Sequence, residues 1–157
     1  HNSTIDISKA KREKLIAILN QSLADAMDLK SQAKHAHWNV KGPNFIALHE
    51  LFDRVATEIE AHVDEIAERI TTLGGTALGT VRIAAEQSAL PQYPLEITDG
   101  TAHVDALSSA LADFGKRVRK NIDETDELGD ADTADLYTGV SRAIDKLLWF
   151  VEAHNQA

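Results

Sequence analysis

Hydrophobic residues recur every three or four positions over four long stretches, the pattern of helices that bury one face. These stretches cover residues 8–40, 44–73, 102–128 and 132–153, with N-caps expected at Ser8, Asn44 and Asp132. The second stretch has the clearest core face, formed by Leu48, Phe52, Val55, Ile59, Val63, Ile66 and Ile70. The pattern predicts an all-α protein.

Glycine and proline separate the predicted helices. Gly42-Pro43 divides the first pair, Gly74-Gly75 ends the second helix, and Gly129 divides the last pair. Residues 76–101 form a long connection, with a short helix expected at 81–88. Two short connections and one long crossover between helices two and three indicate a ferritin-like four-helix bundle. We expect a short N-terminal tail at 1–7 and a single domain at 8–157.

Composition narrows the possible functions. The chain has 157 residues, enough for one domain with a substantial core. It has no cysteine, which excludes disulfides and thiolate chemistry and fits a cytoplasmic protein. No apolar run reaches the length of a membrane span. The net charge of −9 argues against a nucleic-acid surface spread over the whole protein and favours cations as substrates or counter-ions.

Beside its core face, the second helix carries a polar stripe of possible metal ligands: His49, Asp53, Thr57, Glu60, Asp64 and Glu68. Its outer face, with Arg54, Glu58, Glu65 and Arg69, is interpreted as solvated surface. Four-residue spacing places His49 beside Asp53, and Asp64 beside Glu68. Asp53 and Asp64, however, lie roughly 16 Å apart along the helix axis, too far for one metal site.

A two-fold dimer resolves this separation. The residue numbers of His49 and Glu68, and those of Asp53 and Asp64, have the same sum, 117. If two copies of the helix cross antiparallel near residues 58–59, the first pair of one copy meets the second pair of the other. Such a dimer is isologous and forms two equivalent sites at once.

The first helix offers two candidate histidines. His37 lies on its apolar face and is preferred, whereas His35 is predicted to point outward with Asp28 and Ser31. Imidazole and carboxylate ligands without sulfur suit iron, manganese or zinc, and a carboxylate-rich set favours Fe²⁺. By pattern alone, a solvated or salt-bridged face remains the alternative. The hydrolytic motif H-E-x-x-H and the di-iron motif Glu-x-x-His are both absent.

Four segments closely resemble the Dps family of bacterial mini-ferritins: HWNVKGPNFIALHELFD (37–53), DEIAERI (64–70), LGGTALGT (73–80) and DKLLWFVEAH (145–154). The resemblance implies a dodecameric shell that oxidises Fe²⁺, preferably with hydrogen peroxide, stores ferric mineral and limits oxidative damage. The implied ferroxidase ligands are His37, His49 and Asp53 from one subunit, with Asp64 and Glu68 from its two-fold mate.

The resemblance also suggests two further roles. Trp38 would lie near the iron site, where we expect an aromatic packed under the bundle end, with electron donation to peroxide as a secondary role. The acidic run 123–135 would line three-fold pores, with Asp126 and Asp135 as the best matches; otherwise it is ordinary turn and cap chemistry.

The alternative function is a DNA-compacting nucleoid protein whose metal site is secondary. Its candidate contacts form a basic cluster of Lys9, Lys11, Arg12 and Lys14 in the first turns of helix one. Family members that bind DNA use flexible basic tails, and about seven residues precede this helix. The ligand set and the acidic net charge favour iron oxidation over DNA compaction.

Overall fold

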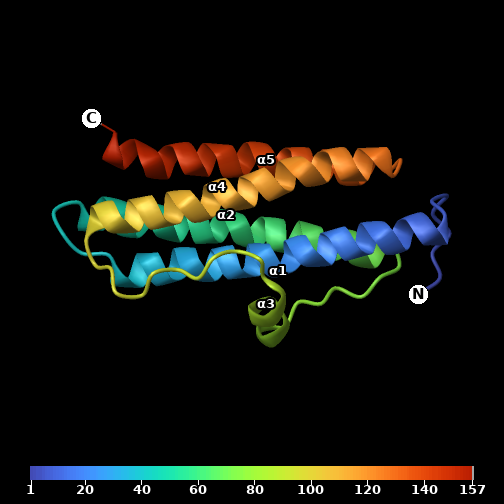
Figure 1. Cartoon of the computed structure of the whole chain (residues 1–157), viewed down its shortest axis with the longest axis horizontal. Coiled ribbons are helices and arrows are strands. Elements are labelled where there is room, and N and C mark those ends of the chain that lie inside the picture. Colours follow the sequence, from blue (N-terminus) through green and yellow to red (C-terminus); the bar gives the residue numbers. More distant parts are fainter. Residues whose placement is uncertain (157) are drawn as a thin grey trace.

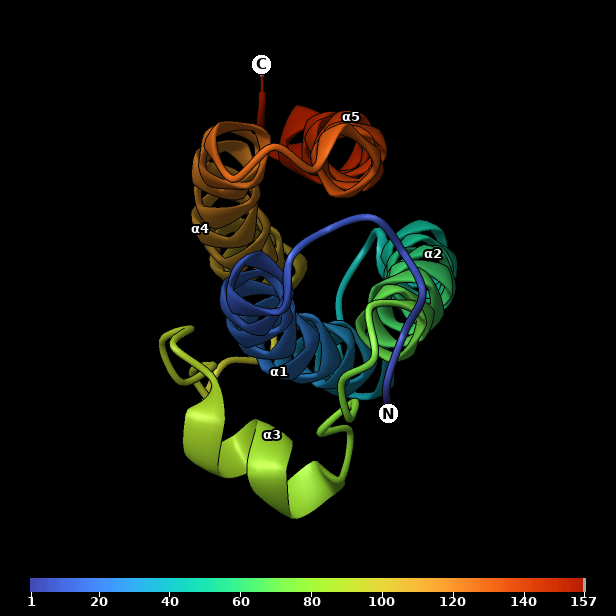
Figure 2. The ribbon, with the colours of Figure 1, turned by 90° about the vertical axis from the view of Figure 1, so that its right-hand side faces the viewer.

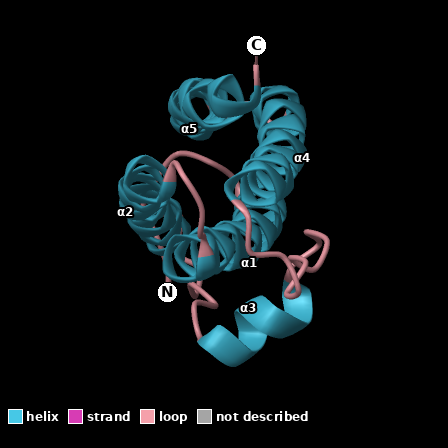
Figure 3. Ribbon diagram, turned by 90° about the vertical axis from the view of Figure 1, so that its left-hand side faces the viewer, coloured by secondary structure: helices cyan, strands magenta, loops and turns pink. Residues whose placement is uncertain are grey.

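Four long helices, one short helix and a terminal 3-10 turn form the chain in a computed structural model that describes residues 1–156. The elements are α1 (Lys9–Asn39), α2 (Phe45–Thr72), α3 (Val81–Gln87), α4 (Gly100–Glu127), α5 (Ala131–Glu152) and η1 (Ala153–Asn155). Figure 3 shows helices joined by loops, with no strand among the described residues. The predicted all-α class is confirmed, and so is the short helix in the crossover.

The long helices lie side by side as two neighbouring pairs, α1 with α2 and α4 with α5 (Figure 1). Seen along the bundle, α1 also packs against α4, and the crossover with α3 covers the outer side of α1 (Figure 2). This is the predicted bundle with one long crossover. No helix in residues 1–156 is long and apolar enough to cross a membrane.

The predicted core face of α2 is confirmed at six of its seven positions. Leu48, Phe52, Val55, Ile59, Ile66 and Ile70 are all buried. Val63 is only half-buried, because it lies at the edge of the face beside the crossover. Each fully buried aliphatic or aromatic side chain contributes about 1.5–3 kcal/mol to folding.

The crossover is fixed to α1 by side chains spaced three or four residues apart, so that they share one face of the helix. Gln21, Asp25, Asp28 and Gln32 hydrogen-bond to Gln87, Ala89, Ser88 and Pro91 at 2.9, 2.8, 2.6 and 3.1 Å, respectively. The prediction that this face points outward is therefore wrong for Asp28 and for His35, which packs against Tyr93 of the crossover. Burial raises the pKa of Asp25.

The α4–α5 turn contains a buried ion pair that the sequence did not reveal. Asp130 is 3% exposed and accepts hydrogen bonds from Arg69 Nη2 at 2.9 and 3.0 Å. Asp130 also caps α5 by accepting from the Thr133 amide at 3.1 Å. The predicted cap at Asp132 is therefore wrong, and so is the prediction that Arg69 belongs to a solvated face.

Candidate metal site

Two of the predicted ligands meet where α1 ends and α2 begins. The chain reverses at Gly42, whose φ of +117° suits glycine, and this turn brings His37 beside His49. Their imidazole rings stack with centroids 3.8 Å apart and planes inclined by 21°. The neighbouring Phe45 ring lies 5.0 Å from His49. The tertiary turn thus favours His37 over His35 as the partner of His49.

Reciprocal hydrogen bonds define how these two imidazoles are protonated. His37 Nδ1 lies 2.7 Å from the His49 carbonyl, and His49 Nδ1 lies 2.8 Å from the His37 carbonyl. Because a carbonyl can only accept, each Nδ1 is the nitrogen that carries a proton, and the neutral form of each ring then keeps a lone pair on Nε2. Metal-binding histidines are commonly oriented in this way, by a carbonyl bonded to the second nitrogen. The pair is therefore preorganised to bind a cation through two Nε2 atoms.

Asp53 lies one turn beyond His49 and is paired with a lysine that the sequence analysis missed. Lys34 Nζ is 2.7 Å from Asp53 Oδ1. The hydrogen bond from Lys34 is the main reason that the pKa of Asp53 falls below its usual value, and the positive charge of Lys34 adds to the effect. Lys34 precedes His37 by three residues, so helical spacing was the available signal. A second lysine, Lys30, pairs with Glu60 at 2.5 Å.

Asp64 and Glu68 are exposed farther along α2. Among the described residues, no group of three or more His, Asp or Glu side chains lies close enough to hold a metal ion. The fold brings His37, His49 and Asp53 to one end of α2, while Asp64 and Glu68 stay apart from them. A five-ligand site at this position would thus require a second chain.

Asp64 lines an open groove of about 920 Å³ between α1, α2 and the crossover. Lys34, Trp38, Val63 and Ala67 line it too. Trp38 is 68% exposed in the single chain, and Lys34 Nζ lies 5.5 Å from its ring centroid. Among residues 1–156 no element covers most of the ring, so the predicted packing of Trp38 under the bundle end would require a second chain.

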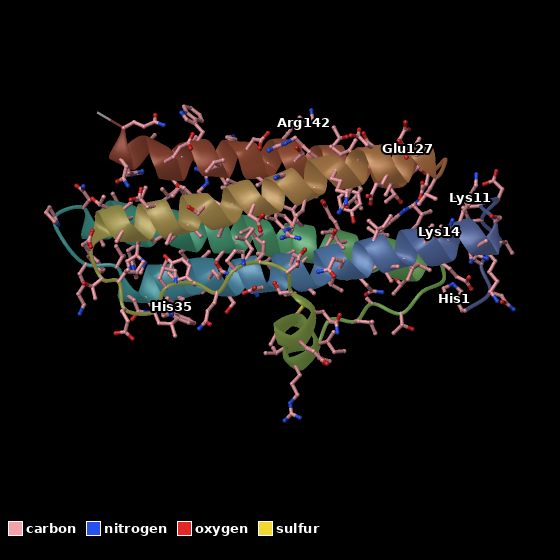
Figure 4. All side chains as sticks on the ribbon, viewed as in Figure 1. His1, Lys11, Lys14, His35, Glu127 and Arg142 are labelled. Atoms are coloured by element: carbon pink, nitrogen blue, oxygen red, sulfur yellow. The ribbon has the colours of Figure 1, made fainter. Side chains whose placement is uncertain are left out.

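The predicted pore residues lie far from these ligands. Asp126 in the last turn of α4 and Asp135 near the start of α5 are both exposed. Figure 4 shows the α4–α5 turn, near Glu127, at the end of the bundle opposite His35. Any role of these aspartates in metal uptake is thus separate from the histidine pair.

Comparison with known proteins shows the structural class and the family of this chain. A Ferritin-like domain model matches residues 16–157. A DNA protection during starvation protein of Agrobacterium fabrum is 46% identical over 156 residues, which cover 99% of this chain and 96% of that protein. Dps of Mycobacterium smegmatis superimposes with a TM-score of 0.95 at 32% identity, covering 100% of this chain and 96% of that one. DpsA14 of Streptomyces coelicolor gives 0.94 at 33% identity, covering 99% and 92%.

The fold is therefore that of the ferritin-like proteins. Within that class, the chain belongs to the Dps family, as the resemblance predicted.

Proposed function

We propose that this protein oxidises Fe²⁺ and stores the ferric product as a mineral inside a dodecameric shell of identical chains. Hydrogen peroxide is the preferred oxidant, ahead of oxygen. Each ferroxidase site takes His37, His49 and Asp53 from one chain and Asp64 and Glu68 from its two-fold mate. The observation that carries the proposal is the stacked histidine pair, whose two Nε2 lone pairs are left for a cation beside Asp53.

The proposed ligands would act in two ways, by binding Fe²⁺ and by stabilising the higher charge of Fe³⁺. Imidazole and carboxylate groups bind Fe²⁺, and the carboxylates favour Fe³⁺ because the higher charge gains more from anionic ligands. Two Fe²⁺ ions held near one peroxide supply both electrons together, so that two protons and the peroxide become two water molecules. Delivery of the electrons as a pair avoids the release of hydroxyl radical. The relatives are named for protecting DNA during starvation, which agrees with removal of Fe²⁺ and peroxide together.

The direct test adds Fe²⁺ and then peroxide to the purified shell under anaerobic conditions and follows the absorbance of the ferric product. We expect two Fe²⁺ ions consumed per peroxide and mineral retained with the protein on gel filtration. His49→Ala should lose this activity, and His154→Ala is its matched control. His154 is exposed, and among the described residues its one hydrogen-bond partner is the Phe150 carbonyl of its own helix end. Iron oxidation no faster than in buffer would contradict the proposal.

Lys34→Gln should bind divalent metal more tightly than the wild type does. The ammonium of Lys34 occupies Asp53 Oδ1, so an incoming ion must displace it. Glutamine keeps a polar side chain, although one bond shorter, and removes the competing charge. Calorimetry with Zn²⁺, a redox-inert probe, measures the change. Lys30→Gln is the matched control because that lysine pairs with Glu60 instead, and equal affinities in both variants would contradict competition at Asp53.

Asp126→Asn combined with Asp135→Asn should slow iron oxidation at low Fe²⁺ and low salt. Three copies of this turn around a three-fold axis would concentrate cations at a pore mouth. The defect should shrink at saturating iron, since the variant leaves the ferroxidase ligands intact. Stopped-flow rates over a range of Fe²⁺ concentrations test this, and wild-type rates throughout would make the run an ordinary acidic turn.

DNA compaction is the second candidate function. The observation in its favour is that a relative is named for DNA protection during starvation. The basic cluster offers little for it, since Arg12 bonds the Ile7 and Leu73 carbonyls and Lys9 pairs with Glu13. The Nζ atom of Lys11 lies close to Gly129 in the acidic α4–α5 turn.

We therefore expect weak or no DNA binding at about 0.15 M salt and neutral pH. A gel shift with linear duplex measures it. A complex that persists at this salt concentration, and that weakens when Lys11 and Lys14 are replaced by glutamine, would favour DNA compaction.

A further inference from the structure

A buried tyrosine–histidine pair joins the crossover to the start of α4, apart from the proposed ferroxidase ligands. Tyr93, in the crossover, is 6% exposed, and His103, in the first turn of α4, is fully buried. Tyr93 Oη lies 2.7 Å from His103 Nδ1, and the two rings stack with centroids 5.9 Å apart. His35 of α1 also packs against Tyr93 in an edge-to-face arrangement, with ring centroids 5.4 Å apart. Nothing in the proposed ferroxidase reaction uses this cluster.

The pairing is suited to moving a proton. Among residues 1–156, His103 Nδ1 is the only hydrogen-bond partner of the Tyr93 hydroxyl. In the neutral tautomer that carries its proton on Nε2, the hydroxyl donates and Nδ1 accepts. Burial lowers the pKa of His103, which favours the neutral ring. Burial also raises the pKa of Tyr93, so the phenol holds its proton at neutral pH. The Ile97 backbone lies near the His103 ring, whose Nε2 has no well-aligned hydrogen-bond partner among the described residues.

We infer that Tyr93 and His103 form a redox-active pair that absorbs stray oxidising equivalents through a tyrosyl radical. A one-electron oxidant of the hydroxyl-radical class takes an electron from the Tyr93 ring and becomes hydroxide. The Oη proton moves to His103 Nδ1 as the electron leaves, which avoids a cationic phenol in a buried site. Fe²⁺ then returns one electron and becomes Fe³⁺, and His103 returns the proton to Oη. Both side chains end unchanged.

The placement of the pair fits this role. His35 and Trp38 are three residues apart on α1, so their Cβ atoms lie about 5–6 Å from one another. Trp38, His35 and Tyr93 line the same groove as Asp64. Aromatic rings thus lead from the exposed Trp38, beside the ligand His37, to the buried Tyr93. That the oxidant arises from iron and peroxide rests on the proposed function. The oxidation of Tyr93 with proton transfer to His103 does not depend on it.

The chain supplies its own control, because it contains only two tyrosines. Tyr137 is also fully buried, but its Oη lies 2.7 Å from Ser22 Oγ, which accepts from Asn121 at 2.9 Å. Neither a hydroxyl nor a carboxamide takes up a proton at neutral pH. Tyr137 therefore has no base to receive its proton, and we expect no radical there.

The experiment oxidises iron-free shells with photogenerated tris(bipyridine)ruthenium(III) and records the electron paramagnetic resonance spectrum after rapid freezing. We expect a tyrosyl signal in the wild type and in Tyr137→Phe, its loss in Tyr93→Phe, and a much weaker signal in His103→Gln. Anaerobic Fe²⁺ added afterwards should abolish the signal. Because no iron is present during the oxidation, failure here is distinct from failure of the ferroxidase.

A signal that persists in Tyr93→Phe, or that disappears in Tyr137→Phe, would overturn the assignment. An undiminished signal in His103→Gln would overturn the proton transfer. If Tyr93→Phe does not fold, Tyr137→Phe still decides between the two tyrosines, because each variant leaves only one source of a tyrosyl radical.

Discussion

Shells assembled from a mixture of His49→Ala and Glu68→Ala chains should recover about a quarter of the wild-type ferroxidase sites. Each variant alone should lose oxidation, because it removes one proposed ligand from every site. In a mixed two-fold dimer, one site lacks both ligands, while the other takes His49 from the Glu68→Ala chain and Glu68 from the His49→Ala chain. Random pairing makes half of the dimers mixed, and one site in each mixed dimer is complete.

The recovery separates a shared site from a site within one chain. The rate of ferric absorbance, per chain, is measured after the variants are dissociated together and reassembled. Native mass spectrometry establishes that mixed dimers are present. Mixing His49→Ala with Asp53→Ala is the matched control, since both ligands would come from the same chain. In that mixture a mixed dimer would keep one complete site only if residues 49 and 53 of a site came from different chains, contrary to the proposed pairing.

The control therefore has a definite expectation under the proposed pairing. A site that takes His49 and Asp53 from one chain is broken by either substitution, so the control mixture should recover nothing. Recovery in the control, or none with His49→Ala and Glu68→Ala despite mixed dimers, would refute the shared site.

Asp130→Asn should lower the free energy of unfolding by about 3 kcal/mol, because removing one partner of a buried ion pair strands the other. Arg69 would lose its anionic partner in a position where its side chain is only 16% exposed. Asparagine can still cap α5, so the loss reports mainly on the ion pair. Asp132→Asn is the matched control, as Asp132 is exposed in the first turn of the same helix.

The same pair predicts how stability depends on pH. Burial by itself raises the pKa of Asp130, but hydrogen bonds from Thr133 and Arg69, with the Arg69 charge, bring the pKa below its usual value. A carboxyl whose pKa is lowered on folding stabilises the protein above its unfolded pKa, about 3.9, and loses this contribution as the pH falls through the folded pKa.

The free energies of unfolding of wild type and Asp130→Asn, measured with guanidinium, should therefore differ most near neutral pH and begin to converge below about pH 4. A gap that is the same at pH 7 and at pH 3, or equal losses in Asp130→Asn and Asp132→Asn, would contradict this assignment.

Much of the fold was predictable because helix formation leaves a local record. The core face of α2 repeats with the helical period, and glycine marks the ends of α2 and α4, so these elements follow from neighbouring residues. The pairing of His49 with Asp53 is local in the same sense, since four residues make one turn. The run 123–135 was predicted to be an acidic turn. Asp130 is its one buried acidic residue, and no neighbouring residue in the sequence distinguishes it from Asp132.

What the tertiary structure decided depends on residues that are distant in sequence. The apolar face of the first helix favoured His37 over His35 as a ligand. The stacking of His37 on His49 and their reciprocal hydrogen bonds to backbone carbonyls, however, form only because the turn at Gly42 folds α2 back along α1. Periodicity gives the direction of a side chain around its own helix axis, but not which other segment covers that side. For this reason the sequence alone determined the helices, the core face and the ligand spacing. The packed chain was required for the Lys34–Asp53 and Arg69–Asp130 pairs and for the packing of His35 against Tyr93 of the crossover.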